Sequence, residues 1–499
     1  MDLAANLMLG FEVALSPINL LYCLVGVLVG TLIGVLPGIG PIAPISMLLP
    51  ITFHLPPVSA LIMLAGIYYG AQYGGSTTAI LVNLPGEASS VVTCIDGYQM
   101  ARQGRAGPAL AVAALGSLFA GCVATLMLAA FAQPLASAAL LFGPAEYFSL
   151  MAFGLVLAIV LAQGSLVPAF AMIAVGLLLG LAGSDVTTGA DRLTFGLIEL
   201  SEGVDFVPLA MGLYAIPEIV KNLEQPEQRS VLREKIGGLW PTAEDFRRAW
   251  PATLRGTGIG SALGILPGSG SMLAAFSAYM VEKQVSRRPE EFGQGAVEGV
   301  AAPESANNAH AQTSFIPLLS LGIPPNAVMA LMAGAMTIQG IQPGPQVMSA
   351  KPDLFWGMIA SMWIGNVMLV VINLPLIRIW VALLKVPYRL LYIAILVFCC
   401  VGVYSLHNST FDIVLLIVFS LVGYAFAKWK LDPAPLVLAF ILGPMIEENL
   451  RRALLVSNGD PTVFLSRPLS LAFLLAALGM IVLFTLPKVK QRRDAALQE

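Results

Sequence analysis

Charged residues are scarce in this chain of 499 residues, at 11% of the composition, whereas 57% of its residues are hydrophobic. Ordinary soluble domains carry about a quarter charged residues, so the composition excludes a soluble protein. Five stretches contain no charged residue and are long enough to cross ~30 Å of hydrocarbon. They are residues 18–36, 109–132, 147–183, 354–377 and 468–487, and 147–183 has room for two helices that turn near 164–168.

Residues for metal, covalent and ATP chemistry are also few or badly spaced. The five cysteines form no C-x-x-C or Cys/His pattern, so we expect free thiols in apolar helices and no metal site. There is no H-E-x-x-H, no pair of Asp-rich motifs and no G-x-x-x-x-G-K-[ST] phosphate loop. A membrane protease, a prenyl transferase and an ATP-driven pump would need these motifs. We therefore expect a protein that is not an enzyme and has no cofactor.

One pattern occurs twice, each time at the end of a long apolar run. Residues 30–41 and 260–271 share six positions at a constant offset of 230 residues. The pairs are Gly30/Gly260, Gly34/Gly264, Leu36/Leu266, Pro37/Pro267, Gly38/Gly268 and Gly40/Gly270. Because proline cannot donate a backbone hydrogen bond and glycine allows positive φ, both helices should stop here. Paired interrupted segments indicate a duplicated transporter and are the best pointer to its binding site.

The duplication extends beyond this motif. Pro85/Pro324, Pro134/Pro375 and Pro144/Pro387 follow in order, at offsets of 239, 241 and 243 residues. We place the two transmembrane repeats at 17–200 and 250–430, a polar connector at 221–255, and a C-terminal transmembrane extension with a basic tail at 431–499. The predicted fold is an all-α polytopic membrane protein with roughly ten to twelve spanning segments, some broken or re-entrant.

The distribution of lysine and arginine predicts the orientation of the repeats. The connector 221–255 holds seven basic residues and the tail 488–493 holds four, whereas no Lys or Arg precedes Arg102. By the positive-inside rule, the connector and the tail are cytoplasmic. The first motif would then enter the membrane from outside and the second from inside, which favours inverted repeats. Arg102 and Arg105 mark another cytoplasmic loop, so parallel repeats remain an alternative.

The two helix breaks suit ion binding. A helix end carries about half an elementary charge, negative at the carbonyl end and positive at the amide end. We predict that a first tip (37–40) and a second tip (267–270) face each other around one substrate near the midplane. Their binding residues are Pro37, Gly38, Gly40, Pro267, Gly268, Ser269, Gly270 and the adjoining Ser271. The alternative is a packing kink, since Gly-x-x-x-Gly alone indicates close helix contact.

A polar cluster follows each motif, at 73–90 and at 302–326, and both read as re-entrant or half-helix segments lining a cavity. The candidate ligands are Ser76, Thr77, Thr78, Asn83, Pro85, Gly86, Glu304, Asn307, Asn308, Pro324, Pro325 and Asn326. A transported Na⁺ would bind near Asn83, Glu304 and Asn307. Glu304 is a site candidate because intramembrane charges are costly, although a surface loop is its alternative. The surface alternative is stronger for Glu87, and a structural role is favoured over proton transfer for His310.

Seven segments in order resemble the large membrane subunit of tripartite tricarboxylate transporters. They are residues 34–41, 69–78, 83–87, 96–107, 266–270, 303–309 and 322–326. The resemblance implies a bacterial inner-membrane carrier for citrate or related carboxylates, driven by an ion gradient. It also implies two partners, a small four-helix membrane subunit and a periplasmic solute-binding protein. The residues agree with symport of Na⁺ or H⁺, because few cationic side chains lie in the clusters to offset an anion. A channel and, more remotely, an intramembrane enzyme are the alternatives.

Overall fold

The computed structural model describes residues 3–36, 40–139, 141–161, 166–185, 188–224, 238–383 and 388–485, which are largely helical. A single short antiparallel pair, β1 (Gly183–Ser184) and β2 (Asp191–Arg192), is present in these ranges. The helices before it are α1 (Leu3–Ala14), α2 (Pro17–Gly34), α3 (Ile42–Thr52), α4 (Pro57–Val82), α5 (Val91–Met100), α6 (Ala106–Ala139), α7 (Pro144–Leu161) and α8 (Leu166–Gly180).

Helices also dominate the chain after the hairpin. They are α9 (Phe206–Ala210), α10 (Ile216–Glu224), α11 (Ala243–Gly264), α12 (Ser271–Val285), α13 (Glu298–Thr313), α14 (Phe315–Leu321), α15 (Ala327–Ile338), α16 (Gln346–Ala350), α17 (Pro352–Asn373), α18 (Ile377–Leu383), α19 (Tyr388–His407), α20 (Thr410–Lys428), α21 (Ala434–Val456), α22 (Val463–Ser466) and α23 (Pro468–Thr485). Short 3-10 and π segments join several of them.

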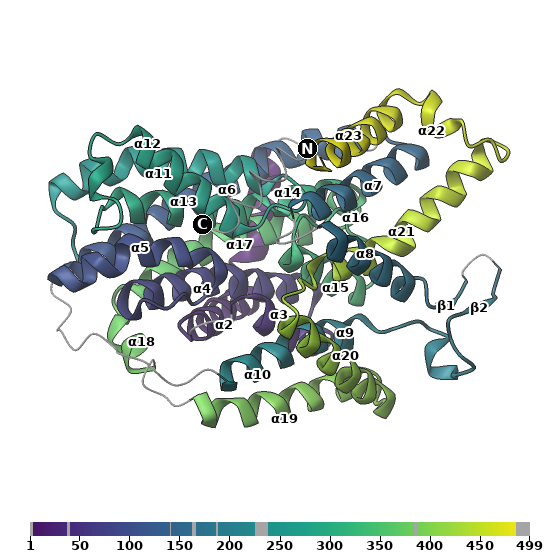
Figure 1. Cartoon of the computed structure of the whole chain (residues 1–499), viewed down its shortest axis with the longest axis horizontal. Helices are drawn as coiled ribbons and strands as arrows, with labels where there is room; N and C mark the ends of the chain where they lie inside the picture. The colour runs from purple at the N-terminus through teal and green to yellow at the C-terminus, as the bar shows by residue number, and fades with distance from the viewer. Residues whose placement is uncertain are drawn as a thin grey trace.

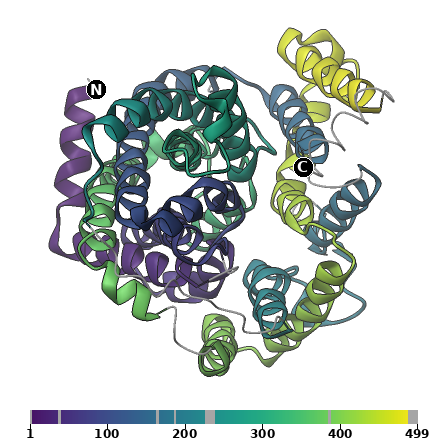
Figure 2. The ribbon, with the colours of Figure 1, turned by 60° about the vertical axis from the view of Figure 1, so that its left-hand side comes forward.

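The helices form two regions. Figure 1 shows α2, α4, α5, α6, α11, α12, α13 and α17 gathered at one end of an elongated molecule, here called the central bundle. Helices α7, α8, α21, α22 and α23 lie at the other end with the hairpin. The turned view of Figure 2 shows the bundle as a rounded body with the remaining helices in an arc beside it. The largest apolar core runs through the bundle and includes the fully buried Tyr68, Phe315 and Trp356.

The predicted helix breaks are confirmed in both halves. Helix α2 ends at Gly34 and α11 ends at Gly264, in each case three residues before the motif proline. The chain then enters α3 and α12. Gly40 has φ +60° and Gly268 has φ +80°, a region that glycine adopts without steric cost. Residues 37–39 lie outside the described residues, so the binding roles of Pro37 and Gly38 stay predictions.

The alternative role of the Gly-x-x-x-Gly pattern, close contact between helices, is also confirmed. A Cβ added to Gly30 would lie 2.5 Å from the carbonyl oxygen of Ile67, and one added to Gly34 would lie 2.2 Å from that of Ala71. Because these atoms belong to the backbone of α4, only glycine allows α2 and α4 to approach so closely. The same residues that precede the helix break therefore hold α2 against α4.

The second half repeats this contact. A Cβ on Gly256 would lie 2.3 Å from the carbonyl oxygen of Ala302, and one on Gly260 would lie 2.1 Å from that of Ala306. Both carbonyls belong to α13, so α11 packs on α13 as α2 packs on α4. The central bundle is therefore built around two close helix pairs, each leading into one tip.

The prediction of a helical membrane protein is confirmed. Four helical segments among the described residues are long and apolar enough to cross a membrane, namely Pro17–Gly34, Ala88–Ala139, Pro352–Asn373 and Thr410–Lys428. Six shorter apolar helices accompany them. The stretch 147–183 does contain two helices, α7 and α8. The chain is thus a multi-pass helical membrane protein, and the number of spans and the repeat boundaries stay predictions.

Two local expectations need correction. Residues 73–82 are not a short segment, because they form the last ten residues of the long α4. The latter part of the connector, 243–255, belongs to α11, and residues 225–237 lie outside the described residues. Two of the three arginines of this part are paired, because Arg248 contacts Glu291 and Glu298, and Arg255 contacts Glu282. The hydrogen bond from Arg248 holds the pKa of Glu291 below its usual range.

Candidate functional site

A buried carboxylate lies where the two halves of the chain meet. Glu304, in the middle of α13, is 1% exposed. Ser76 of α4 donates its hydroxyl to Oε2 at 2.6 Å, and Thr93 of α5 donates to Oε1. Both carboxylate oxygens of a second-half residue thus accept hydrogen bonds from first-half hydroxyls. The surface-loop alternative for Glu304 is wrong, because the residue sits inside a buried helix.

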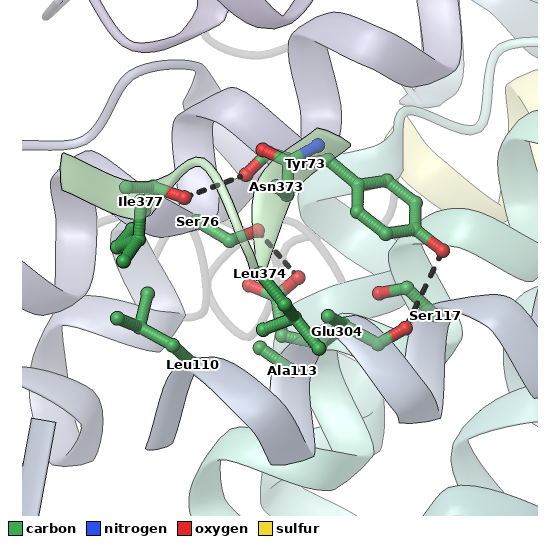
Figure 3. A pocket seen from close by; sticks show the side chains of 11 residues that line it. Tyr73, Ser76, Leu110, Ala113, Ser117, Glu304, Asn373, Leu374 and Ile377 are labelled. Atoms are coloured by element: carbon green, nitrogen blue, oxygen red, sulfur yellow. Dashed lines mark hydrogen bonds between the residues drawn. The ribbon is translucent and has the colours of Figure 1, made fainter. Parts of the chain in front are cut away.

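A small cavity adjoins Glu304 between α4, α6, α13 and the α17–α18 region (Figure 3). It is lined by Tyr73, Ser76, Thr77, Leu110, Ala113, Ala114, Ser117, Glu304, Asn373, Leu374 and Ile377. In Figure 3 the Ser76 hydroxyl points at the Glu304 carboxylate, while the Tyr73 ring lies above α6. The Tyr73 hydroxyl donates to the carbonyl of Ala114 at 3.4 Å. The lining is apolar on α6 and polar toward α4 and α13.

A second buried carboxylate belongs to the loop after α4. Glu87 is 6% exposed, and its Oε1 accepts hydrogen bonds from Ser89 Oγ and, at 2.8 Å, from Asn307 Nδ2 of α13. The surface alternative that we considered for Glu87 is therefore wrong as well. Asn307 joins the two halves, as Glu304 does one turn earlier on the same helix.

The described residues give neither carboxylate a positive partner. Their ion pairs include no contact to Glu87 or Glu304. Removing a charge from water without a partner costs several kcal/mol, and hydroxyl and amide donors offset only part of this. Such residues inside a membrane protein mark substrate or ion pathways.

Several buried side-chain amides among the described residues lack complete hydrogen-bond partners. Asn308 donates to Ser117 Oγ at 2.7 Å, but its Oδ1 has no hydrogen-bond partner. The same holds for Oδ1 of Asn307, Asn366 and Asn373 and for both side-chain atoms of Gln72 and Gln312. Buried acceptors are normally satisfied, so this set is a reservoir of oxygen ligands. Asn366 and Asn373 were missed from the sequence because they occupy an otherwise apolar helix, α17.

The second tip is held by its own half. Gly268 donates its N–H to the carbonyl of Pro325 at 2.7 Å, which joins the tip to the loop 322–326. The fully buried His310 lies 3.2 Å from Ser269 Oγ through Nε2 and 3.3 Å from Ser271 Oγ through Nδ1. His310 therefore contacts the tip, and its structural role stays a prediction.

The loop 322–326 faces the first half. Asn326 caps α15 by accepting from Met329 N at 3.0 Å, and its Nδ2 donates to Ser314 Oγ at 3.2 Å. The fully buried side chain of Tyr68, in α4, lies near the side chains of Ser271 and Asn326. Tyr68 is another residue that the sequence did not single out, because its neighbours in α4 give no polar pattern there.

The first tip is also joined to its loop by a backbone contact, but from a donor two motif positions later than in the second tip. Gly40 donates its N–H to the carbonyl of Gly86 at 3.1 Å, which joins the end of this tip to the loop 83–87. Thr78 donates to the carbonyl of Val35 at 2.6 Å, just beyond the last residue of α2. Helix α4 thus contacts the carbonyl end of α2 directly.

Some predicted site residues do not converge. Asn83 is exposed and ends α4 in the left-handed conformation at φ 56°, so its side chain does not join the Glu304 cluster. Gly270 is exposed, and Pro267 is half-buried. Pro324 and Pro325 are buried in the second loop, and Pro85 is half-buried in the first. The predicted residues that the fold brings together are Ser76, Thr77, Glu304, Asn307 and Asn308.

The site has no resemblance to a metal centre. Within the described ranges, no group of three or more His, Cys, Asp or Glu residues could hold a metal ion. The five cysteines are free, and Cys23 and Cys399 are buried. The arrangement offers buried oxygens, two carboxylates and uncharged donors, which suits the binding of small ions.

Comparison with known proteins identifies the family. The profile described as "Tripartite tricarboxylate transporter TctA family" matches residues 20–438. A protein of Agrobacterium vitis, "Uncharacterized 52.8 kDa protein in TAR-I ttuC' 3'region", is 58% identical over all 499 residues and 99% of its own length. A second from the same organism, "Uncharacterized protein in TAR-II ttuC' 3'region", is 54% identical over 48% of this chain and 99% of its own length. No solved structure matches the chain. Since the family profile covers most of the chain, the protein belongs to the tripartite tricarboxylate transporter TctA family.

Proposed function

We propose that the chain is the large permease subunit of a binding-protein-dependent secondary transporter that imports citrate or a related carboxylate with Na⁺ or H⁺. The observation that carries this proposal is the cluster of buried carboxylates and amides between the two halves, in a chain of this family. Glu304 and Glu87 lack a positive partner among the described residues, so a bound cation would offset their charge. A cation that neutralises the site then permits an anionic substrate to enter.

A two-fold relation between the halves supports a carrier with one shared site. Glu87 contacts Asn307, and Asn326 contacts Tyr68. An offset of 239 residues relates Glu87 to Asn326 and Tyr68 to Asn307. Reciprocal contacts of this kind arise when two equivalent parts face each other across a two-fold axis. Together with the uneven distribution of basic residues, this favours inverted repeats that alternate around the site.

The proposed substrate lies between the two tips and the Glu304 cavity. The second tip offers donors for a carboxylate, because it precedes the amide end of α12, whose first residue is Ser271. The first half offers the carbonyl end of α2 and the Glu87 carboxylate, which favour a cation. Citrate itself is proposed from the family alone.

The partners and the location follow from the same family. A small membrane subunit and a periplasmic solute-binding protein would complete the system in the inner membrane of a bacterium. Exposed apolar side chains on α20, such as Ile417 and Leu421, fit contact with lipid. The basic connector and tail would face the cytoplasm.

The test is uptake of labelled citrate into proteoliposomes that contain this chain and its small subunit. The binding protein is added outside, with and without an imposed Na⁺ gradient and, separately, a pH gradient. We expect uptake that needs both the binding protein and one of the gradients. If another carboxylate moves under these conditions and citrate does not, the mechanism holds and the substrate changes. If nothing moves under any gradient, the proposed function is wrong.

A further inference from the structure

We propose that Glu87 and Asn307 form the binding site for the coupling cation, a small monovalent ion of the Na⁺ type. This inference rests on the proposed function, because it assigns one part of that symport to particular atoms. Sequence reasoning placed the cation near Asn83, Glu304 and Asn307, whereas the structure turns Asn83 outward. The site proposed here therefore differs from the sequence prediction in its acidic ligand.

The orientation of the Asn307 amide provides the first argument. An ionised carboxylate only accepts hydrogen bonds, so the group that faces Glu87 Oε1 at 2.8 Å must be the amide nitrogen. The amide oxygen then points elsewhere, and Oδ1 is buried without a hydrogen-bond partner in a residue that is 1% exposed. A cation would stabilise both the carboxylate and the unsatisfied amide oxygen. A neutral donor would leave the negative charge of the carboxylate without compensation.

The end of α2 provides the second argument. Gly86 packs so closely on this end that an added Cβ would lie 2.2 Å from the carbonyl oxygen of Gly34. Glu87 is the next residue, and its Cβ lies 3.8 Å from where a Cβ of Gly40 would be. The carbonyl end of a helix is negative, and discontinuous helices of carriers bind Na⁺ through such ends. Glu87 thus lies beside the carbonyl end of α2 and, through its hydrogen bond to Asn307, beside a buried amide whose oxygen is unsatisfied.

Glu304 fits this role less well. Both its oxygens already accept a hydroxyl hydrogen bond, from Ser76 and from Thr93. The space beside Glu87 is kept by glycine, because a Cβ on Gly75 would lie 3.0 Å from Glu87 Cγ. We infer that Glu87 is the cation ligand, whereas Glu304 borders the cavity described above.

The test measures cation binding directly on the purified full chain in detergent. Thermal unfolding is followed while NaCl replaces choline chloride at constant ionic strength, for the natural protein and for Glu87→Gln, Asn307→Ala and Glu146→Gln. Glu146 is a matched control, because it is also buried but caps the backbone N–H of Gly143 far from the site. A ligand that binds only the folded state raises its melting temperature.

We expect Na⁺ to raise the melting temperature of the natural protein and of Glu146→Gln in a saturable way. In Glu87→Gln the apparent affinity should fall about 100-fold or more, because charged oxygen ligands dominate binding of hard cations. Asn307→Ala should show a smaller loss. Without Na⁺, Glu87→Gln should be at least as stable as the natural protein, since it removes an unpaired buried charge, so loss of the Na⁺ response would not reflect misfolding.

Three results would overturn the inference. The first is an unchanged Na⁺ response in Glu87→Gln, and the second is the absence of any response in the natural protein. The third is stabilisation by acid in place of Na⁺ that depends on Glu87, which would make the residue a proton site. A Na⁺ response that is lost in Glu87→Gln, in a protein that transports no carboxylate, would support the cation site and contradict the proposed function.

Discussion

The two halves of the central bundle have the same backbone plan and different charges. In each half a glycine-rich helix packs on a neighbour, breaks, and leads to a tip that donates a backbone hydrogen bond to a loop. The donors, Gly40 to Gly86 and Gly268 to Pro325, differ by two positions in the motif. At the end of that loop the first half has Glu87 and the second has Asn326. This difference is the basis of the proposed division of roles, in which the first half binds the cation and the second half binds the anion.

The first experiment tests whether the halves share their packing. Gly30→Val and Gly260→Val should each destabilise the protein by about 3 kcal/mol or more, since an added side chain meets the backbone of α4 or α13. Thermal unfolding and the yield of monodisperse protein are the measurements. Gly258→Val is the control, because a Cβ there has nothing within 4 Å. Tolerance of valine in one half alone would contradict the shared plan.

The second experiment concerns the carboxylate between the halves. Glu304→Gln should lower carboxylate uptake by about 100-fold, because an intramembrane carboxylate without a partner is retained for function. Glu298→Gln is the control and should keep most of the uptake. Glu298 lies earlier in α13 and is paired with Arg248. Unchanged uptake with unchanged ion dependence in Glu304→Gln would remove this residue from the mechanism.

The third experiment makes the second half resemble the first. Asn326→Asp keeps a side chain that can cap α15 but places a negative charge beside the second tip. We expect the KM for the carboxylate to rise about 10-fold, equivalent to roughly 1.4 kcal/mol, with the Na⁺ dependence unchanged. Asn326→Ser, which is neutral and also caps helices, should have a much smaller effect. If the substitution changes the Na⁺ dependence and leaves the KM unaltered, the proposed roles of the halves are reversed.

The smallest effect is expected at the cross-contact of Tyr68. Tyr68→Phe removes a buried hydroxyl that lies near Ser271 and Asn326 and should raise the KM for the carboxylate by about 3- to 5-fold, or roughly 1 kcal/mol. Tyr404→Phe is the control, because Tyr404 is 41% exposed on α19. Initial rates of uptake over a range of substrate concentrations measure both. Equal kinetics in the two variants would show that this contact has no part in substrate binding.

The sequence predicted the helix breaks because their cause is local. Proline lacks an N–H and glycine adopts positive φ wherever they occur, so the ends of α2 and α11 follow from a few residues. The close helix pairs also follow from Gly-x-x-x-Gly. Glu304, Asn307 and Asn308 lie within two turns of α13, and their predicted role as ligands stays a prediction.

The rest of the site depends on tertiary contacts that no local pattern encodes. Thr93 reaches Glu304 from α5, and Asn373 reaches the cavity from α17, although neither lies in the polar clusters. Asn83 shows the opposite error, since it was predicted as a ligand but ends α4 in a left-handed conformation. Asparagine followed by Leu-Pro-Gly is typical of such a helix end, so this signal was present in the sequence.

The most direct test of the account is counterflow in proteoliposomes preloaded with unlabelled carboxylate and supplied with a trace of labelled carboxylate outside. A carrier with one site shared by two alternating halves predicts transient accumulation of label above its external concentration. This accumulation should be absent in Glu304→Gln. Label that only equilibrates, without exceeding the external concentration, would contradict the account and indicate a channel.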